Sequence, residues 1–314
     1  MANGNLPAER VYRTWAIDSG RWQHYRPRAG DIIVATYPKC GTTWTQRIVD
    51  LLLHQSTEPR PLGQVGAWVD ARFREPIEKV VAHLEAQIGR RSLKSHVPLD
   101  GMPFYDDVRY IHVARDGRDA CMSFHNHTLA YTAEALARFD AIGLQDPALG
   151  RPMRRSSPDP REFFRMWLSA GEDETAPNLP FFDFEMTYWR ERKRPNVLMV
   201  HYNDLKKDLP EMRRIAGFLD ITVPDGIWDA LVDAATFETM RKDGEKLMPQ
   251  ARATFEGGSS RFLFKGTNER WREVLTDEDI ALYEAKAASA MTPACAAWVA
   301  GGRLEAGEPR TLAD

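Results

Sequence analysis

Short β-branched apolar runs alternate along the chain with segments that carry apolar residues at helical spacing. Residues 31–37 form such a run, which is typical of a strand buried on both faces of a parallel sheet. A tight turn at residues 38–41 follows, and residues 43–55 then place apolar side chains three and four positions apart. This order predicts a strand, a turn and an amphipathic helix.

The same order recurs twice. Residues 108–114 and 196–201 have the composition of buried strands. Helices are expected to follow them, the first running through Ser123 and the second from about residue 209 to 219, and a further strand is expected to end at residues 91–94. Strands that alternate with helices predict an α/β fold, with a central parallel sheet flanked by helices.

The length and composition suit one large globular domain. The 314 residues are 43% apolar and 28% charged, which is ordinary usage. The expected organisation is an N-terminal segment (1–27), a single domain (28–300) and a polar C-terminal tail (301–314) that frays. Within the domain, residues 131–190 are expected to form a loop-rich acceptor or lid region, because residues 131–160 are polar and rich in glycine and proline.

Charge and cysteine content exclude several classes of function. The 42 basic and 45 acidic residues give a net charge of −3, so nucleic acid is not an expected partner and any anion needs a local site. Apolar runs are too short for a membrane span and the N-terminus lacks a signal core, which predicts a soluble, cytoplasmic protein. Cys40, Cys121 and Cys295 are odd in number and lack CxxC spacing, which argues against disulfides or a zinc site.

The segment Tyr37–Trp44 lies between a predicted strand and a predicted helix. Free N–H groups at a helix start bind phosphate, and Gly41 lets the backbone approach an anion closely. Thr42 and Thr43 add hydroxyl groups, and Lys39 adds charge. The segment is therefore a candidate phosphate loop.

This loop is not a Walker A motif, because Lys39 precedes its only glycine. A strand, turn and helix with one lysine is also a common structural unit. Cys40 is expected to be a small filler in the turn, although a helix N-terminus can lower the pKa of a thiol.

Five segments, taken in order, resemble the motifs of the cytosolic-type sulfotransferases, and the chain is similar to a bacterial member of that family. Tyr37–Trp44 resembles the loop for the 5′-phosphosulfate, and Val113–Ser123 resembles the 3′-phosphate motif. Lys94-Ser95-His96 matches the place of the family's catalytic histidine. His201–Leu205 and Thr236–Met240 resemble the segments that hold adenine and phosphate. The similarity runs from about residue 28 to 275 and implies a P-loop-like, nucleotide-binding sulfotransferase fold.

The resemblance implies transfer of a sulfuryl group from 3′-phosphoadenosine 5′-phosphosulfate (PAPS) to a hydroxyl or amine by in-line displacement, without a metal. His96 matches the general base, and Lys39 and Lys94 suit the charge on the leaving phosphate. The residues expected to contact PAPS, or its product 3′-phosphoadenosine 5′-phosphate (PAP), are Lys39, Cys40, Gly41, Thr42, Thr43, Trp44, Arg115, Ser123, Tyr202, Thr236, Phe237, Met240, Lys265 and Gly266.

One motif departs from the family pattern. Lys265, Gly266 and Trp271 match it, but Phe264 stands where the family has an arginine that binds the 3′-phosphate. Arg261 or Arg270 is the candidate to replace that arginine.

The acceptor is expected to be small and apolar or aromatic: a phenol, an alcohol or a glycolipid head group. Aromatic residues crowd residues 163–189 and recur at Phe124, so some can line an acceptor pocket. His125 and His127 do not share a helix face and are not expected to bind metal, and His112 and His201 are expected to be structural. A homodimer is compatible with the sequence.

Two other classes of function are compatible with parts of the sequence. A P-loop kinase or nucleotidase needs a lysine after a second glycine and an acidic Mg²⁺ ligand at a strand end, and neither is evident. A nucleotide-binding protein without activity is the other alternative. The presence of both Lys39 and His96 favours an active enzyme.

Overall fold

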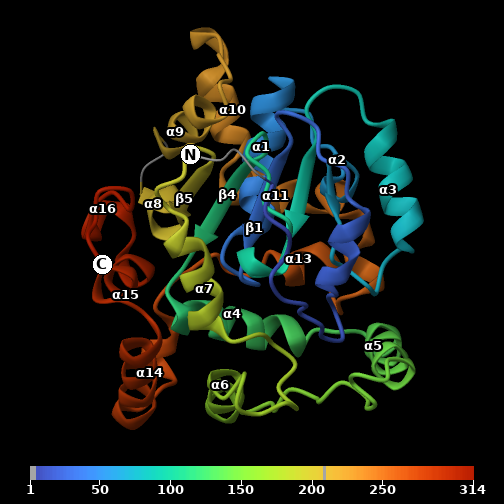
Figure 1. Cartoon of the computed structure of the whole chain (residues 1–314), viewed down its shortest axis with the longest axis vertical. Helices are drawn as coiled ribbons and strands as arrows, with labels where there is room; N and C mark the ends of the chain where they lie inside the picture. The colour runs from blue at the N-terminus through green and yellow to red at the C-terminus, as the bar shows by residue number, and fades with distance from the viewer. Residues whose placement is uncertain (1–4, 208–209) are drawn as a thin grey trace.

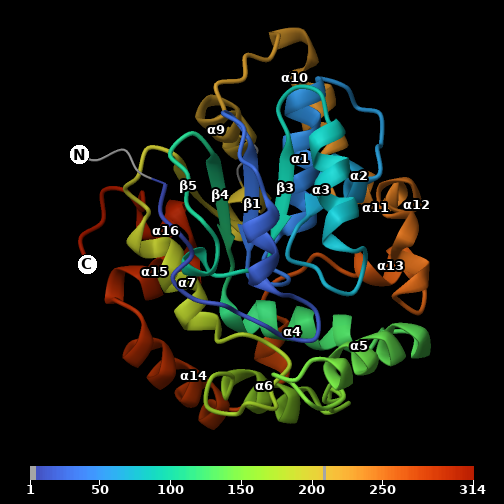
Figure 2. The ribbon, with the colours of Figure 1, turned by 45° about the vertical axis from the view of Figure 1, so that its right-hand side comes forward.

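The computed structural model describes residues 5–207 and 210–314. Its centre is a five-stranded sheet in the order β2-β3-β1-β4-β5, and every neighbouring pair is parallel. The strands are β1 (Ile32–Thr36), β2 (Gly66–Trp68), β3 (Ser92–Ser95), β4 (Arg109–Ala114) and β5 (Val197–His201). Helices flank this sheet (Figures 1 and 2), so the predicted α/β class and central parallel sheet are confirmed.

Helices cover both faces of the sheet. The longer ones are α1 (Thr42–His54), α3 (Ile77–Ala86), α4 (Gly117–Thr128), α5 (Ala133–Gln145), α6 (Pro160–Leu168), α7 (Phe181–Arg190), α9 (Pro210–Phe218), α10 (Trp228–Ala234), α14 (Asp277–Ala290) and α15 (Pro293–Gly301). The shorter ones are α2 (Leu62–Val65), α8 (Tyr202–Lys207), α11 (Phe237–Lys242), α12 (Gly244–Leu247), α13 (Gly258–Phe262) and α16 (Arg303–Ala306).

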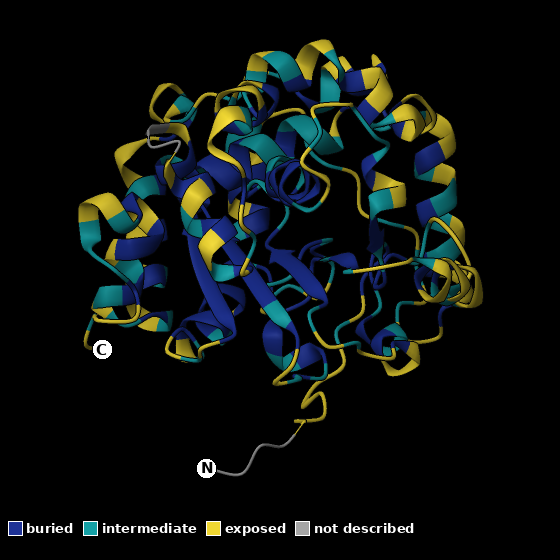
Figure 3. Cartoon of the chain, turned by 90° about the horizontal axis from the view of Figure 1, so that it is seen from above, coloured by how far each residue is buried: buried dark blue, intermediate teal, exposed yellow. Residues whose placement is uncertain are grey.

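Alternate side chains of β1 enter two separate cores. Ile33 and Ala35 pack into a cluster with side chains of α3, α4, α6, α7, α14 and α15, whereas Ile32 and Val34 pack with α1, α9 and α10. Because both faces of the strand are covered, its residues are apolar without alternation, as the sequence indicated. The view from above shows the buried strands between the two helical layers (Figure 3).

The parallel strands all end at one edge of the sheet, and the predicted motifs follow those ends. The loop 38–41 comes after β1, His96 directly follows β3, Arg115 directly follows β4, and Tyr202 directly follows β5. Ligands bind at this edge in open α/β sheets. The fold therefore brings together segments that are more than 160 residues apart in the sequence.

Two expectations about irregular segments need correction. Residues 131–160 are irregular from 146 to 159, but they also contain the helix α5 (Ala133–Gln145), which buries Ala135 and Phe139. The tail does not fray: Asp314 accepts a hydrogen bond from the Trp189 indole, and the buried Arg192 donates to the carbonyl oxygens of Pro309 and Leu312. The predicted start of a helix at Leu209 lies outside the described residues; α9 begins at Pro210.

Candidate active site

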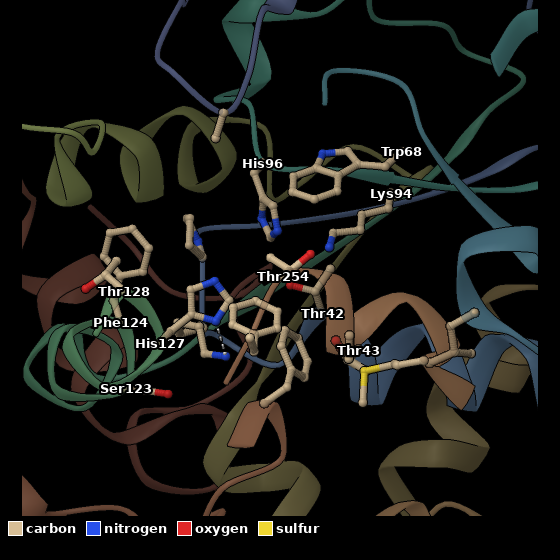
Figure 4. Close-up of a pocket in the computed structure, with 18 of the residues that line it drawn as sticks. Thr42, Thr43, Trp68, Lys94, His96, Ser123, Phe124, His127, Thr128 and Thr254 are labelled. Atoms are coloured by element: carbon tan, nitrogen blue, oxygen red, sulfur yellow. Dashed lines mark hydrogen bonds between the residues drawn. The ribbon is translucent and has the colours of Figure 1, made fainter. Parts of the chain in front are cut away.

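A cavity of about 860 Å³ opens at the carboxyl edge of the sheet. The three predicted catalytic residues, Lys39, Lys94 and His96, all line it. Most of the predicted nucleotide contacts line the same cavity: Gly41, Thr42, Thr43, Trp44, Arg115, Ser123, Tyr202, Phe237, Met240, Lys265 and Gly266. Figure 4 shows His96 and Lys94 facing the start of α1 across this space, with Ser123 on the opposite side. Cys40 and Thr236 are the two predicted contacts outside the lining.

The loop between β1 and α1 has a backbone shaped for an anion. Its backbone is left-handed at Lys39 (φ 73°) and Gly41 (φ 114°). A Cβ atom at Gly41 would lie 3.0 Å from Cδ2 of Tyr202, so this position needs glycine for close approach as well as for conformation. The helix N-terminus that follows leaves backbone N–H groups without helical partners. The cavity-lining N-terminus of α1 is therefore a ready site for a phosphate.

Cys40 and Thr236 do not line the cavity, but each is next in sequence to a residue that does. Cys40 is fully buried, its amide donates to the carbonyl oxygen of Tyr37, and burial raises the pKa of its thiol well above the ordinary value. Its burial in the turn is consistent with a small filler. Thr236 caps α11 by accepting a hydrogen bond from the amide of Thr239.

His96 is held in one tautomer by the backbone. Its Nδ1 lies 2.8 Å from the carbonyl oxygen of Thr36. Because a carbonyl oxygen can only accept, Nδ1 carries the proton and Nε2 is unprotonated. Burial, and then the charge of Lys94, lowers the pKa of His96 well below its ordinary value, so the ring is neutral at neutral pH. The side chain can accept a proton at Nε2.

Two lysines beside His96 have strongly lowered pKa values. Burial lowers the pKa of Lys39 to about 7, with further lowering from the charges of Arg115 and Arg270. Burial also lowers the pKa of Lys94 to about 7, with the largest further lowering from the charge of Arg74. Both ammonium groups gain from a bound anion, since it would favour their charged forms.

Trp68 lines the cavity and is hydrogen-bonded to the buried Asp70, and the sequence did not reveal either residue. The Trp68 ring packs edge-on to His96 at 5.1 Å between centroids, and the Lys94 Nζ lies 3.9 Å from the Trp68 centroid. The buried Asp70 carboxylate accepts hydrogen bonds from the Trp68 indole at 2.8 Å and from the His96 amide at 3.1 Å. β2 has only three residues, too few for a periodic signal, so pattern reading missed it.

His127 is a second histidine of the cavity that sequence reasoning did not select. Its Nδ1 lies 3.4 Å from the Nζ of Lys39, which also lies 4.3 Å from the ring centre of Phe262. Burial lowers the pKa of His127 well below its ordinary value, so the ring is neutral and its Nδ1 can accept a hydrogen bond from Nζ of Lys39. In the sequence, the spacing of His125 and His127 was used only to judge a metal site. His127 lies four positions after Ser123, on the same helix face, and this offset is the signal that could have identified it.

Arg115 is a buried cation at the end of β4. Its guanidinium donates to the Asn268 side chain at 2.7 Å and to the carbonyl oxygens of Lys39 and Thr267. The Tyr202 ring lies 4.3 Å from Cζ of Arg115. Its Nε has no hydrogen-bond partner in the described part of the chain.

Three cations surround the ring of Phe264, the residue that departs from the family pattern. Arg261 lies 5.1 Å, Lys265 5.3 Å and Arg270 5.8 Å from its centroid, and all four residues line the cavity. The charge of Arg115 lowers the pKa of Arg270, after the larger effect of burial. Arg270 therefore lies close enough to Arg115 to act on the same anion.

The aromatic residues of 163–189 divide between the core and the cavity. Phe124 and Phe184 line the cavity. The others lie in the core: Phe163, Phe164, Trp167, Phe181, Phe182, Tyr188 and Trp189. Tyr131 and Phe139, from the predicted acceptor region 131–190, also line the cavity. Further aromatic lining comes from segments that sequence reasoning did not select: Trp15, Trp68, Phe73, Phe255 and Phe262. His112 and His201, which were expected to be structural, are buried and hydrogen-bonded, His112 to Glu185 and His201 to the carbonyl oxygen of Val299.

Residues 5–207 and 210–314 contain no group of three or more His, Cys, Asp or Glu side chains that could hold a metal ion. Within the same residues, no helix is long and apolar enough to cross a membrane.

A parallel sheet with a phosphate loop after its central strand, and a neutral histidine and two lysines at its carboxyl edge, defines a nucleotide-dependent group-transfer enzyme. The sulfotransferase domain family matches residues 29–292, and the chain belongs to it. It is 33% identical to a glycolipid sulfotransferase of Mycobacterium bovis, over 93% of this chain and 94% of the relative, and 25% identical to mouse sulfotransferase 1B1, over 83% of each. The chain is a sulfotransferase.

Solved structures share the fold at low sequence identity. Retinol dehydratase in complex with androsterone and the inactive cofactor PAP has a TM-score of 0.69 at 20% identity, covering 92% of each chain. Mouse sulfotransferase SULT7A1 complexed with PAP has a TM-score of 0.66 at 16% identity, covering 90% of this chain and 94% of that one. At these identities the comparison establishes the sulfotransferase fold.

Proposed function

We propose that this enzyme transfers the sulfuryl group of PAPS to a hydroxyl group of a small acceptor. One observation carries the proposal: His96 has its unprotonated Nε2 in the same cavity as Lys39, Lys94 and the phosphate loop. Solved structures of this fold carry PAP, the product that PAPS leaves, and mycobacterial relatives are named for glycolipids. A phenol, an alcohol or a glycolipid head group is the corresponding acceptor.

The cavity offers donors and charges that suit PAPS. The Nε of Arg115 and the indole N–H of Trp44 are buried without a partner in the described residues, which is expected where a ligand supplies the acceptor atoms. The start of α1 and Lys39 bind the 5′-phosphosulfate, and Arg115 with Ser123 binds the 3′-phosphate. Trp44 flanks the adenine.

These residues account for the proton and the charge that move in the transfer step. The acceptor oxygen attacks sulfur and gives its proton to Nε2 of His96. The new oxygen–sulfur bond forms as the bond between sulfur and the bridging phosphate oxygen breaks, and the electron pair stays on that oxygen. Lys39 and Lys94 stabilise the developing charge, and the products are a sulfate ester and PAP.

Ligand-dependent melting tests the donor class. A ligand at about a hundredfold its dissociation constant stabilises by roughly 2.7 kcal/mol, which gives a clear melting shift. We expect this shift with PAP in the absence of metal, and not with AMP. A shift with ATP and Mg²⁺ alone would instead support a kinase or nucleotidase.

Transfer of labelled sulfate from PAPS to phenol and glycolipid acceptors tests the chemistry. His96→Asn should reduce transfer by at least about a thousandfold while PAP still raises the melting temperature. His24→Asn, at an exposed histidine outside the cavity, is the matched control and should transfer normally. Turnover by the His96 variant at the wild-type rate would show that another group removes the proton.

A further inference from the structure

A second group of cations lines the cavity on the side of α3 and α5. Arg74 belongs to the connection between β2 and α3, and Lys79, Arg138 and Arg154 line the same region. Glu75 is the one acid in the cavity lining that the described residues provide. This region is therefore basic although it does not contain the phosphate loop.

Arg74 is the one arginine of this group without a hydrogen-bonded or ion-paired protein partner in the described residues. Arg138 pairs with Glu134 and Arg154 pairs with Asp173. In the described residues, Arg74 makes neither a hydrogen bond nor an ion pair; its guanidinium instead lies 5.4 Å from the Trp68 ring centre and 5.7 Å from that of Phe73. Arginine that lines a cavity without a carboxylate partner is well placed to bind an oxyanion from solution.

Trp68 connects Arg74 to the reacting residues. Lys94 lies 3.9 Å from the centre of the same indole ring and His96 packs against its edge (Figure 4). Arg74 and Lys94 are thus separated by no more than the sum of their distances to the ring centre, 5.4 and 3.9 Å. A group bound at Arg74 is within the length of one small molecule of an oxygen at His96.

The cations around the reaction centre form two electrostatic groups. Arg115 and Arg270 act on Lys39, beside the phosphate loop, whereas Arg74 acts on Lys94. The phosphates of the proposed donor would neutralise the charge of the first group. In the second group Arg74 repels Lys94, whereas on Arg74 itself the attraction of Glu75 outweighs the repulsion from Arg138, so the repulsion is centred on Lys94. An anion that is not part of the donor would relieve this repulsion.

We infer that the acceptor carries an oxyanion group, such as a carboxylate or a sulfate or phosphate ester, which Arg74 binds while the acceptor hydroxyl faces His96. The inference rests on the proposed function and narrows its acceptor class. The aromatic side chains beside Arg74 include Phe73 and Phe139, which contact each other. They hold the apolar part of the acceptor, between its oxyanion group and its hydroxyl group. Arg74 is then a specificity-determining residue and takes no part in the bond changes.

A matched pair of phenols tests this inference: 3-(4-hydroxyphenyl)propionate and its uncharged amide. Binding of each probe to the protein in saturating PAP is measured by calorimetry, and transfer from PAPS is followed in parallel. We expect the carboxylate to bind at least about tenfold more tightly than the amide. Arg74→Gln should remove this difference and leave binding of the amide within about twofold, and Arg74→Lys should retain part of it.

Arg213→Gln supplies the matched control. Arg213 is also an exposed arginine stacked on a tryptophan, 4.4 Å from the Trp228 ring centre, but it lies outside the cavity. This variant should keep the full preference for the carboxylate. Equal affinity of the wild type for the two probes, failure of both to bind, or an unchanged preference in Arg74→Gln would overturn the inference. PAP binding in the same samples reports on the proposed function separately, because Arg74 does not contribute to it.

Discussion

At the scale of single residues, the reactive groups of the site depend on contacts between distant parts of the chain. Lys39 and His96 each follow a strand that ends at the same sheet edge. The tautomer of His96 depends on the carbonyl of Thr36, 60 residues away, and the contact between His127 and Lys39 spans 88 residues. No local pattern contains these distances, so His127 was missed.

The lowered pKa values of the lysines predict that donor binding takes up protons. In the free enzyme the pKa of Lys39 and that of Lys94 are about 7, so both are largely neutral at pH 8. A bound polyanion favours the ammonium forms and raises both pKa values, and PAP affinity should therefore fall as the pH rises from 7 to 8.5. Calorimetry at pH 8 in two buffers of different ionisation enthalpy measures the uptake. Lys39→Met should lower it, and proton release on binding would contradict the prediction.

Phe264 leads to a prediction about the 3′-phosphate. Arg270 interacts with Arg115, and both line the cavity beside Phe264. Arg270→Gln should weaken PAP binding by roughly tenfold to a hundredfold, the range of a hydrogen bond to a charged group, and change AMP binding little because AMP lacks the 3′-phosphate. Competition titrations of both nucleotides measure this. Arg261→Gln is the comparison, and a larger loss in that variant would assign the compensation to Arg261.

At the scale of elements, long periodic segments were predicted well and short or mixed ones poorly. Helix α1 was expected at 43–55 and spans Thr42–His54, because its apolar face is unambiguous. Helix α5 was missed because the prolines and glycines that follow it dominated residues 131–160, although Thr132 caps it and Ala135 and Phe139 are one turn apart. Composition over a wide window concealed a helix that the local pattern contained.

The packed C-terminal tail gives a stability prediction. Arg192 is buried and donates to the carbonyl oxygens of Pro309 and Leu312, so removing residues 308–314 leaves a buried cation without these partners. The free energy of unfolding should fall by about 2–4 kcal/mol. Urea denaturation measures the loss. Arg252→Gln, which breaks an exposed ion pair with Glu245, should cost less than about 1 kcal/mol, and an equal effect of the two changes would contradict the prediction.

At the scale of the whole molecule, positive charge is concentrated in the cavity, although the chain as a whole is slightly acidic. The chain has a net charge of −3, which excluded a generally basic protein. The cavity is nevertheless lined by many cations: Lys39, Arg74, Lys79, Lys94, Arg115, Arg138, Arg154, Arg261, Lys265 and Arg270. These cations come from distant parts of the sequence, so only the fold brings them together. The surrounding protein has a low dielectric constant, which strengthens the electric field of the cations in the cavity.

This concentration of positive charge predicts a steep salt dependence of donor binding in an acidic protein. The PAP dissociation constant should rise at least about tenfold between roughly 0.05 and 0.5 M NaCl, because salt screens the attraction between the anion and the partly exposed cations at the cavity. Adenosine, which has no phosphate, should change by less than about twofold over the same range. Equilibrium titration at constant pH measures both ligands. A PAP affinity that does not respond to salt would mean that hydrogen bonds from the loop at Gly41 and from Arg115 hold the nucleotide, and that the cavity's concentrated charge contributes little to its capture.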